Sequence, residues 1–123
     1  MQLSEDIVVK VRAICKVIQG YKFTLASEEA LKAEMADALI AHGVNVLKEH
    51  VLNKENRLDF FFHGLAVEVK IKGQRRAIFK QCERYCSFDE VKGLLLITNK
   101  AMALPEKING KPCFVFRLGK SWL

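Results

Sequence analysis

The sequence predicts one α/β domain, with a mixed central β-sheet flanked by helices in the order ααβββαββ. Three observations carry this prediction, and the first two are segments with apolar residues at every third or fourth position and short apolar runs that suit strands. Size is the third, because 123 residues, 50% of them hydrophobic, supply one core and no second domain. We therefore assign 1–123 to a single domain, with 1–24 as an N-terminal helical extension.

Two amphipathic helices are expected before the first strand. The first begins at Ser4 and ends near Gly20, with an apolar stripe formed by Ile7, Val11, Ile14 and Ile18. The second begins after Ser27 and ends at Gly43, a residue typical of helix C-termini. The stripe of the first helix could form a homodimer interface or close the core of the monomer.

Three strands are expected next. Residues 44–52 alternate weakly, and 57–71 predict a hairpin that turns at His63-Gly64. With two or four loop residues in that turn, Phe60 faces Val67. One face of the hairpin is then apolar and is expected to carry Leu58, Phe60, Phe62, Val67, Val69 and Ile71.

The remaining segments complete the sheet. Residues 74–87 predict a third helix, whose buried side holds Ile78, Cys82 and Tyr85 or Cys86. The unbroken apolar run in 91–98 indicates a central strand covered on both faces. A short helix is expected within 99–107 and a last strand over 113–118. Trp122 is expected to pack against the domain.

Positive charge is concentrated in one part of the chain. The formal net charge is +6, and the segment from Lys70 to Arg84 holds one acid, Glu83, among six basic residues. Such a patch suits a polyanion such as nucleic acid, although a solvated helix face has the same composition. No apolar run is long enough to span a membrane and no secretory signal is recognisable, which predicts a cytoplasmic protein.

The predicted hairpin carries two acids and a lysine on its polar face. Asp59 and Glu68 are expected to be directly opposite, with Cβ atoms about 5 Å apart, and Arg57 opposite Lys70. Facing carboxylates repel one another, and a divalent cation between them is the simplest remedy. Lys70 lies two residues after Glu68 and therefore projects from the same face. Ordinary surface residues on an amphipathic hairpin are the alternative.

These motifs resemble the PD-(D/E)xK nuclease superfamily, which includes archaeal-type Holliday junction resolvases and virus-type replication-repair nucleases. The resemblance covers 27–99 and rests on Arg57-Leu-Asp59, Glu68-Val-Lys70 and Gln81-x3-Tyr85. The last is similar to the QxxxY motif of recombination-helicase exonucleases. Leu58 replaces the name-giving proline of the family. The resemblance implies a restriction-endonuclease-like core.

The resemblance also implies a metal-dependent DNA nuclease that hydrolyses phosphodiester bonds with an activated water. Asp59, Glu68 and the backbone carbonyl of Val69 would bind Mg²⁺, for which Mn²⁺ would substitute, and Lys70 would orient or deprotonate the water. A glutamate on the preceding helix would join them. Glu28 is favoured over Glu29 because it lies on the buried stripe; either acid could instead complement the helix dipole.

The remaining implied residues face the DNA. Gln81 and Tyr85 would reach the site or the DNA strand. Phosphate contacts are expected from the basic residues Lys72, Arg75, Arg76, Lys80 and Arg84. The expected activity is structure-specific or weakly sequence-specific cleavage in DNA repair and recombination, with a homodimer supplying paired cuts. The competing prediction is a catalytically inactive nucleic-acid-binding or assembly module on the same fold.

Overall fold

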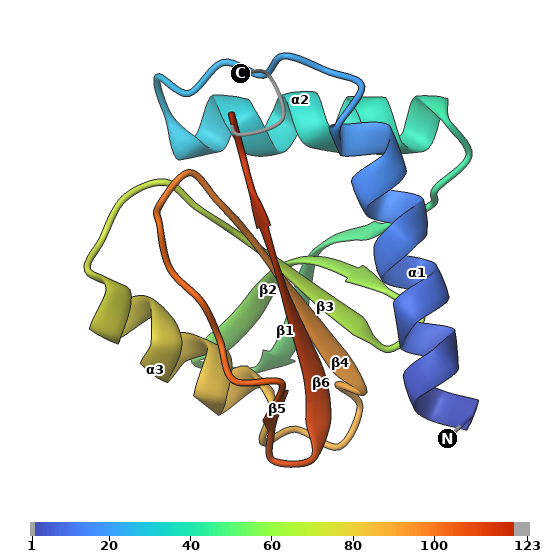
Figure 1. The fold of residues 1–123 in the computed structure, drawn as a ribbon, viewed down its shortest axis with the longest axis vertical. Helices are drawn as coiled ribbons and strands as arrows, with labels where there is room; N and C mark the ends of the chain where they lie inside the picture. The colour runs from blue at the N-terminus through green and yellow to red at the C-terminus, as the bar shows by residue number, and fades with distance from the viewer. Residues whose placement is uncertain (1, 120–123) are drawn as a thin grey trace.

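A six-stranded mixed sheet with helices on both faces makes up the structure (Figure 1). This computed structural model describes residues 2–119, with side chains from Asp6 onward. The elements are α1 (Gln2–Ile18), α2 (Glu28–Ala41), β1 (Leu47–Asn53), β2 (Asn56–Phe62), β3 (Leu65–Lys70), α3 (Arg75–Tyr85), β4 (Gly93–Thr98), β5 (Lys107–Ile108) and β6 (Lys111–Arg117). The predicted α/β class is confirmed. Trp122 lies outside the described residues.

The strands are arranged in the order β1-β2-β3-β4-β6-β5. The strands β3, β4 and β6 run parallel to one another, while β1 and β2 are antiparallel to their neighbours and β5 is antiparallel to β6. Every residue of β4 is buried, which confirms the central strand predicted for 91–98. The short β5 was not predicted and extends the expected order of elements by one strand.

Helices α1 and α2 cover one face of the sheet. The apolar stripe of α1 is buried together with Leu31, Met35 and Leu39 of α2. It therefore closes the monomer core, one of the two roles the sequence left open. Because α1 begins at Gln2, Ser4 lies inside the helix and is not its N-cap. Ser27 does cap α2, since its Oγ accepts a hydrogen bond from the Ala30 N–H at 3.0 Å.

Helix α3 covers the opposite face. Its predicted buried side is confirmed, because Ile78, Cys82, Tyr85 and Cys86 all belong to a second core cluster. That cluster also contains Leu94 and Leu96 of β4, whereas Leu95 and Ile97 face α1 and α2. Alternation along the central strand thus separates the two cores.

The helix predicted within 99–107 is not formed. Residues 99–106 have no regular secondary structure and lead into β5. Since β4 and β6 are parallel, the chain must return along the length of a strand before β6 begins. An extended chain advances about 3.3 Å per residue but a helix only about 1.5 Å, so a helix over this segment would be too short.

Gly93 lets α1 approach β4 closely. A Cβ built at this position would lie 2.6 Å from Cγ2 of Ile7, which is 1% exposed. We expect Gly93→Ala to destabilise the fold by about 1 to 3 kcal/mol in urea unfolding, as overpacked cores do. Gly20→Ala is the matched control, because its Cβ would meet only the Val17 carbonyl oxygen at 3.5 Å. Equal stability of the two variants would contradict this account of the α1 packing.

The β2–β3 hairpin has the predicted register. Phe60 pairs with Val67, and Phe62 pairs with Leu65 across a two-residue turn. His63 and Gly64 both have positive φ angles, 47° and 93°, as tight hairpin turns require. The ladder stops at the Phe60–Val67 pair, so the expected pairing of Arg57 with Lys70 and the regular pairing of Asp59 with Glu68 are not formed.

Strand β2 is continuous from Asn56 to Phe62, but its ladder pairing is interrupted at Asp59. On its other side, β1 pairs with Leu58 and Phe60 but skips Asp59, and Glu49 beside this gap has a φ of 53°. Leu58 consequently packs in the α3 cluster, whereas Phe60 packs beneath α1 and α2. The prediction that Leu58 lies on the same face as Phe60 is wrong, because the alternation of faces is broken where the ladder skips Asp59.

Candidate metal and nucleic-acid site

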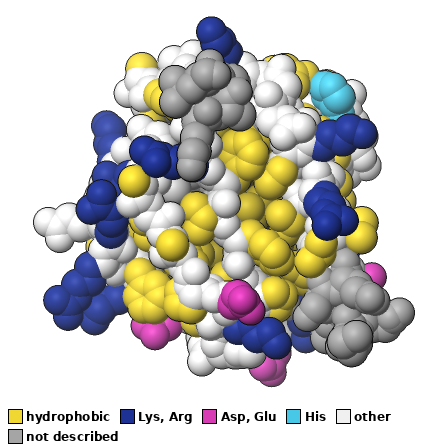
Figure 2. All heavy atoms as spheres, in the orientation of Figure 1, with side chains coloured by type: hydrophobic (Ala, Val, Ile, Leu, Met, Phe, Trp, Pro, Cys, Tyr) yellow, Lys and Arg dark blue, Asp and Glu magenta, His cyan; other side chains and the backbone are white. Residues whose placement is uncertain are grey.

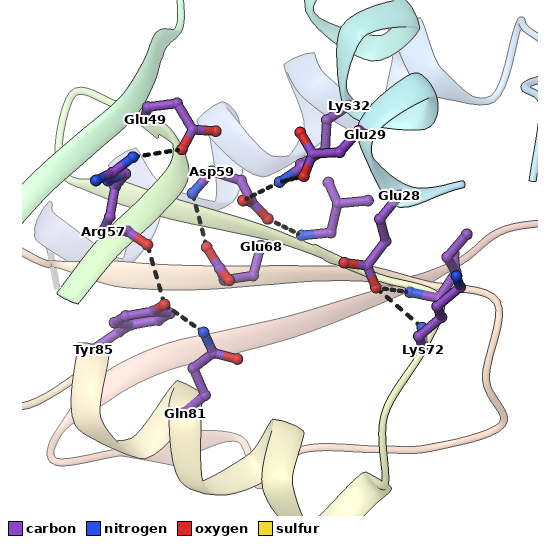
Figure 3. A network of polar contacts seen from close by, with 12 residues as sticks. Glu28, Glu29, Lys32, Glu49, Arg57, Asp59, Glu68, Lys72, Gln81 and Tyr85 are labelled. Carbon is purple, nitrogen blue, oxygen red and sulfur yellow. Dashed lines mark hydrogen bonds and ion pairs between the residues drawn. The ribbon is translucent and has the colours of Figure 1, made fainter. Parts of the chain in front are cut away.

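Asp59 and Glu68 are held together through backbone amides (Figure 3). The Asp59 N–H donates to Glu68 Oε1 at 2.8 Å, and the Val69 N–H donates to Asp59 Oδ2 at 2.8 Å. Asp59 is 9% exposed and Glu68 only 2%. The two acids therefore lie close together as predicted. Hydrogen bonds from backbone N–H groups to their carboxylates take the place of the backbone ladder beyond the Phe60–Val67 pair.

Burial and mutual repulsion shift both acids toward protonation. Burial, followed by the charge of Asp59, raises the pKa of Glu68 to about 8. Burial also raises the pKa of Asp59, while the Val69 N–H and the Lys32 ammonium oppose that rise. Because Asp59 has this positive partner, we assign the proton of the pair to Glu68 at neutral pH.

Lys32 is a site residue that the sequence reasoning missed. From α2 its Nζ lies 3.1 Å from Asp59 Oδ1 and 3.1 Å from Glu29 Oε2. Burial lowers the pKa of Lys32, but the two acids outweigh burial and hold it above its usual value. The available signal was its position four residues after Glu28, which puts both side chains on one side of the helix.

Glu28 and Glu29 have different partners. Glu28 Oε1 accepts hydrogen bonds from the N–H groups of Ile71 at 2.8 Å and Lys72 at 3.0 Å, directly after β3 ends (Figure 3). The Glu29 side chain is 86% exposed and pairs with Lys32. The contacts of Glu28 make it the better candidate for the helical acid, because they fix the backbone next to Lys70.

Lys70 is the last residue of β3 and is half-buried. It has the same strand parity as Glu68 and Ala66, and Ala66 packs in the α3 cluster, so Lys70 faces the α3 side. Its charge acts on both carboxylates and counters the rise in their pKa values. Among the residues with described side chains, no ion pair involves Lys70. The ammonium is therefore close enough to influence the pair and is not fixed by another acid.

The Gln81 and Tyr85 pair connects α3 to β2. The Tyr85 hydroxyl donates to the Arg57 carbonyl at 3.1 Å and accepts from Gln81 Nε2 at 2.6 Å. Burial and then the charge of Glu68 raise the pKa of Tyr85 above its usual value, which indicates that the ring lies beside the carboxylates. These contacts support a positioning role for the motif, because they fix α3 against β2 next to the carboxylates.

The five predicted DNA-binding residues are all exposed on α3 and the segment before it: Lys72, Arg75, Arg76, Lys80 and Arg84. Arg75 Nε donates to the Ala101 carbonyl at 3.0 Å, and Arg84 Nε reaches Asn56 Oδ1 at 3.4 Å. Figure 2 shows Lys and Arg side chains along its left edge, the side on which Figure 1 shows α3. A basic surface thus borders the carboxylate site.

The donor set suits a small, hard cation. Within the described part of the chain, no group of three or more His, Cys, Asp or Glu side chains is arranged to hold a metal. Asp59 and Glu68 supply two carboxylates, and Mg²⁺ commonly binds one or two carboxylates and retains several waters. Lys32 contacts one oxygen of Asp59, so its ammonium supplies part of the compensating charge that a cation would bring.

Comparison with known protein families, curated proteins and solved structures found no match to this chain. None of the helices described is long and apolar enough to cross a membrane.

Proposed function

We propose that this protein is a Mg²⁺-dependent deoxyribonuclease of the PD-(D/E)xK type. The supporting observation is the buried Asp59–Glu68 pair, in which burial and repulsion raise the pKa of Glu68 to about 8. Two acids buried side by side weaken a fold unless their charges are compensated, and strongly perturbed groups of this kind concentrate at functional sites. Lys70 and the basic surface of α3 lie beside them.

Each site residue has a distinct part in this proposal. Asp59, Glu68 and the Val69 carbonyl would hold the ion, which when bound would lower the pKa of an attacking water and stabilise charge on the phosphate. Lys70 would orient or deprotonate that water. Glu28 would position Lys70 by holding the two amides that follow it.

The substrate class follows from the basic surface. Exposed Lys and Arg side chains on α3 suit the phosphates of DNA, and contacts of this kind carry no sequence information. We therefore propose structure-specific or weakly specific cleavage, as used in DNA repair and recombination. Paired cuts would require a homodimer, and its interface would have to lie outside the buried stripe of α1.

The direct test is a panel of labelled duplex, single-stranded, flap and four-way-junction DNA incubated with Mg²⁺ or with EDTA. The proposal requires metal-dependent cleavage of at least one substrate and its loss in Glu68→Gln, which keeps the shape of the side chain. Cleavage that persists in Glu68→Gln would point to a contaminating nuclease.

A second candidate is a nucleic-acid-binding or assembly module without catalysis. One observation favours it: each carboxylate already accepts a backbone N–H from the neighbouring strand, so the pair also fastens β2 to β3. Calorimetric titration of Mg²⁺ or Mn²⁺, with Asp59→Ala as the control, separates the two. Absence of metal-dependent heat in the wild type would favour the binding module.

The contribution of α3 to DNA binding can be measured separately. We expect Arg76→Ala with Lys80→Ala to weaken DNA binding and to reduce the slope of log K against log salt by roughly two units, about one per phosphate contact. Arg12→Ala with Lys16→Ala is the matched control, because both residues are exposed, four apart, on α1 across the sheet. An unchanged slope in the α3 double variant would mean that Arg76 and Lys80 are solvated surface residues that make no phosphate contacts.

A further inference from the structure

A groove lies between β6 and the segment 101–104. Its apolar lining includes Met102, Leu104 and Val115, and Arg117 contributes a positive charge. Its volume is about 610 Å³, and it is open to solvent. The three apolar residues pack against the α3 cluster, so the groove opens on the same face of the sheet as Lys70.

The strand register connects this groove to the carboxylate site. Glu68 pairs with Leu96, which pairs with Val115 of the groove. Two residues further along the strands, Lys70 pairs with Thr98, which pairs with Arg117. Neighbouring strands lie about 4.8 Å apart, so the Cα atoms of Lys70 and Arg117, two strands apart, are separated by about 10 Å. Paired residues of parallel strands share a face, which puts both rows on one surface.

The charge around the groove suits an anion attached to an apolar group. Arg75 donates to the carbonyl of Ala101, a groove residue, and so brings a second guanidinium to the edge of the groove. Apolar lining next to these cations matches a nucleotide, which combines a flat base with a charged phosphate. The apolar side chains near β6, with Lys and Arg beyond them, are visible in Figure 2.

We propose that this groove binds a nucleotide of the DNA strand next to the scissile phosphate, with its phosphate on Arg117 and its base on Met102, Leu104 and Val115. This inference rests on the proposed function, because the carboxylate site defines the scissile position. A base can enter such a groove only after leaving its stack, so single-stranded DNA is the occupant and intact duplex is disfavoured.

Binding can be tested without cleavage. The probe is a fluorescein-labelled single-stranded oligothymidylate, titrated by anisotropy in EDTA. Arg117→Ala should bind about tenfold more weakly at low salt, with a salt slope reduced by about one unit. Arg12→Ala, which removes the same charge from an exposed position on α1, should bind like the wild type. Identical affinities for the two variants would overturn the proposal.

A second measurement locates the base directly. An oligonucleotide containing 5-iododeoxyuridine should photocrosslink to the peptide of residues 101–104 or to that of β6, and Arg117→Ala should lose this crosslink. Crosslinks confined to other segments would exclude the groove. Both measurements are made in EDTA and therefore do not depend on cleavage. If the groove does not bind the oligonucleotide, this inference alone is wrong. If it binds but no Mg²⁺-dependent cleavage occurs, only the nuclease proposal is wrong.

Discussion

Lys70→Ala should reduce the rate of Mg²⁺-dependent DNA cleavage at least about a hundredfold, as removal of a positioned catalytic group does. Metal binding should persist, because both carboxylates remain. The physical reason is that the Lys70 ammonium faces the Glu68 side of the sheet and its charge acts on both acids. Single-turnover cleavage and calorimetric Mg²⁺ titration of the same variant separate the two effects.

Two further variants test whether the effect is specific to Lys70. Lys16→Ala removes an exposed lysine of α1, on the opposite face of the sheet, and should keep the rate within a few-fold. Lys32→Met removes the ammonium that contacts Asp59 at 3.1 Å. If Lys32→Met lost cleavage while Lys70→Ala kept it, the active lysine would belong to α2 and not to β3.

Without metal, Glu68→Gln should raise the free energy of unfolding at neutral pH, whereas Asp59→Asn should lower it. Repulsion between the acids alone predicts that neither substitution lowers it. However, Asp59 accepts from the Val69 N–H and pairs with Lys32, so an asparagine amide would leave the half-buried ammonium with Glu29 as its acid partner. We expect Asp59→Asn to cost about 2 kcal/mol in urea unfolding, within the range for a hydrogen bond to a charged group. Both variants should lose Mg²⁺-dependent cleavage.

The stability of Glu68→Gln should depend on pH in a defined way. The pKa of Glu68 is raised in the fold from 4.5 to about 8, so between these values the folded state holds a proton that the unfolded state has lost. Stability of the wild type therefore falls as pH rises from about 5 to 8, whereas Glu68→Gln lacks this loss. The melting temperature of Glu68→Gln minus that of the wild type should increase across this interval, by about 5 °C or more.

Mg²⁺ provides the matching control. A cation bound by the ionised pair should raise the melting temperature of the wild type at pH 8 and leave Glu68→Gln almost unchanged. If the melting-temperature difference between the two proteins were constant from pH 5 to 8, Glu68 would titrate normally in the fold. The electrostatic basis of the proposed site would then be wrong.

The sequence alone determined most of the regular structure. The ends of α2 were readable because Ser27 and Gly43 act through local backbone geometry, and the Phe60–Val67 register followed from the two-residue turn at His63-Gly64. These features depend on residues close together in the chain. The nearness of Asp59 and Glu68 was predictable for the same reason, since one hairpin carries both.

Only the tertiary structure decided how the candidate site is assembled. The ion pair of Asp59 with Lys32 and the capture of two amides by Glu28 join segments 27 to 44 residues apart, and the gap in the ladder at Asp59 accompanies them. The alternation of apolar residues predicts which face of a regular strand is buried, but it does not show where the alternation fails. Leu58 was therefore assigned to the wrong face of the sheet. The row from Lys70 through Thr98 to Arg117 likewise depends on parallel pairing of distant strands, which no local pattern encodes.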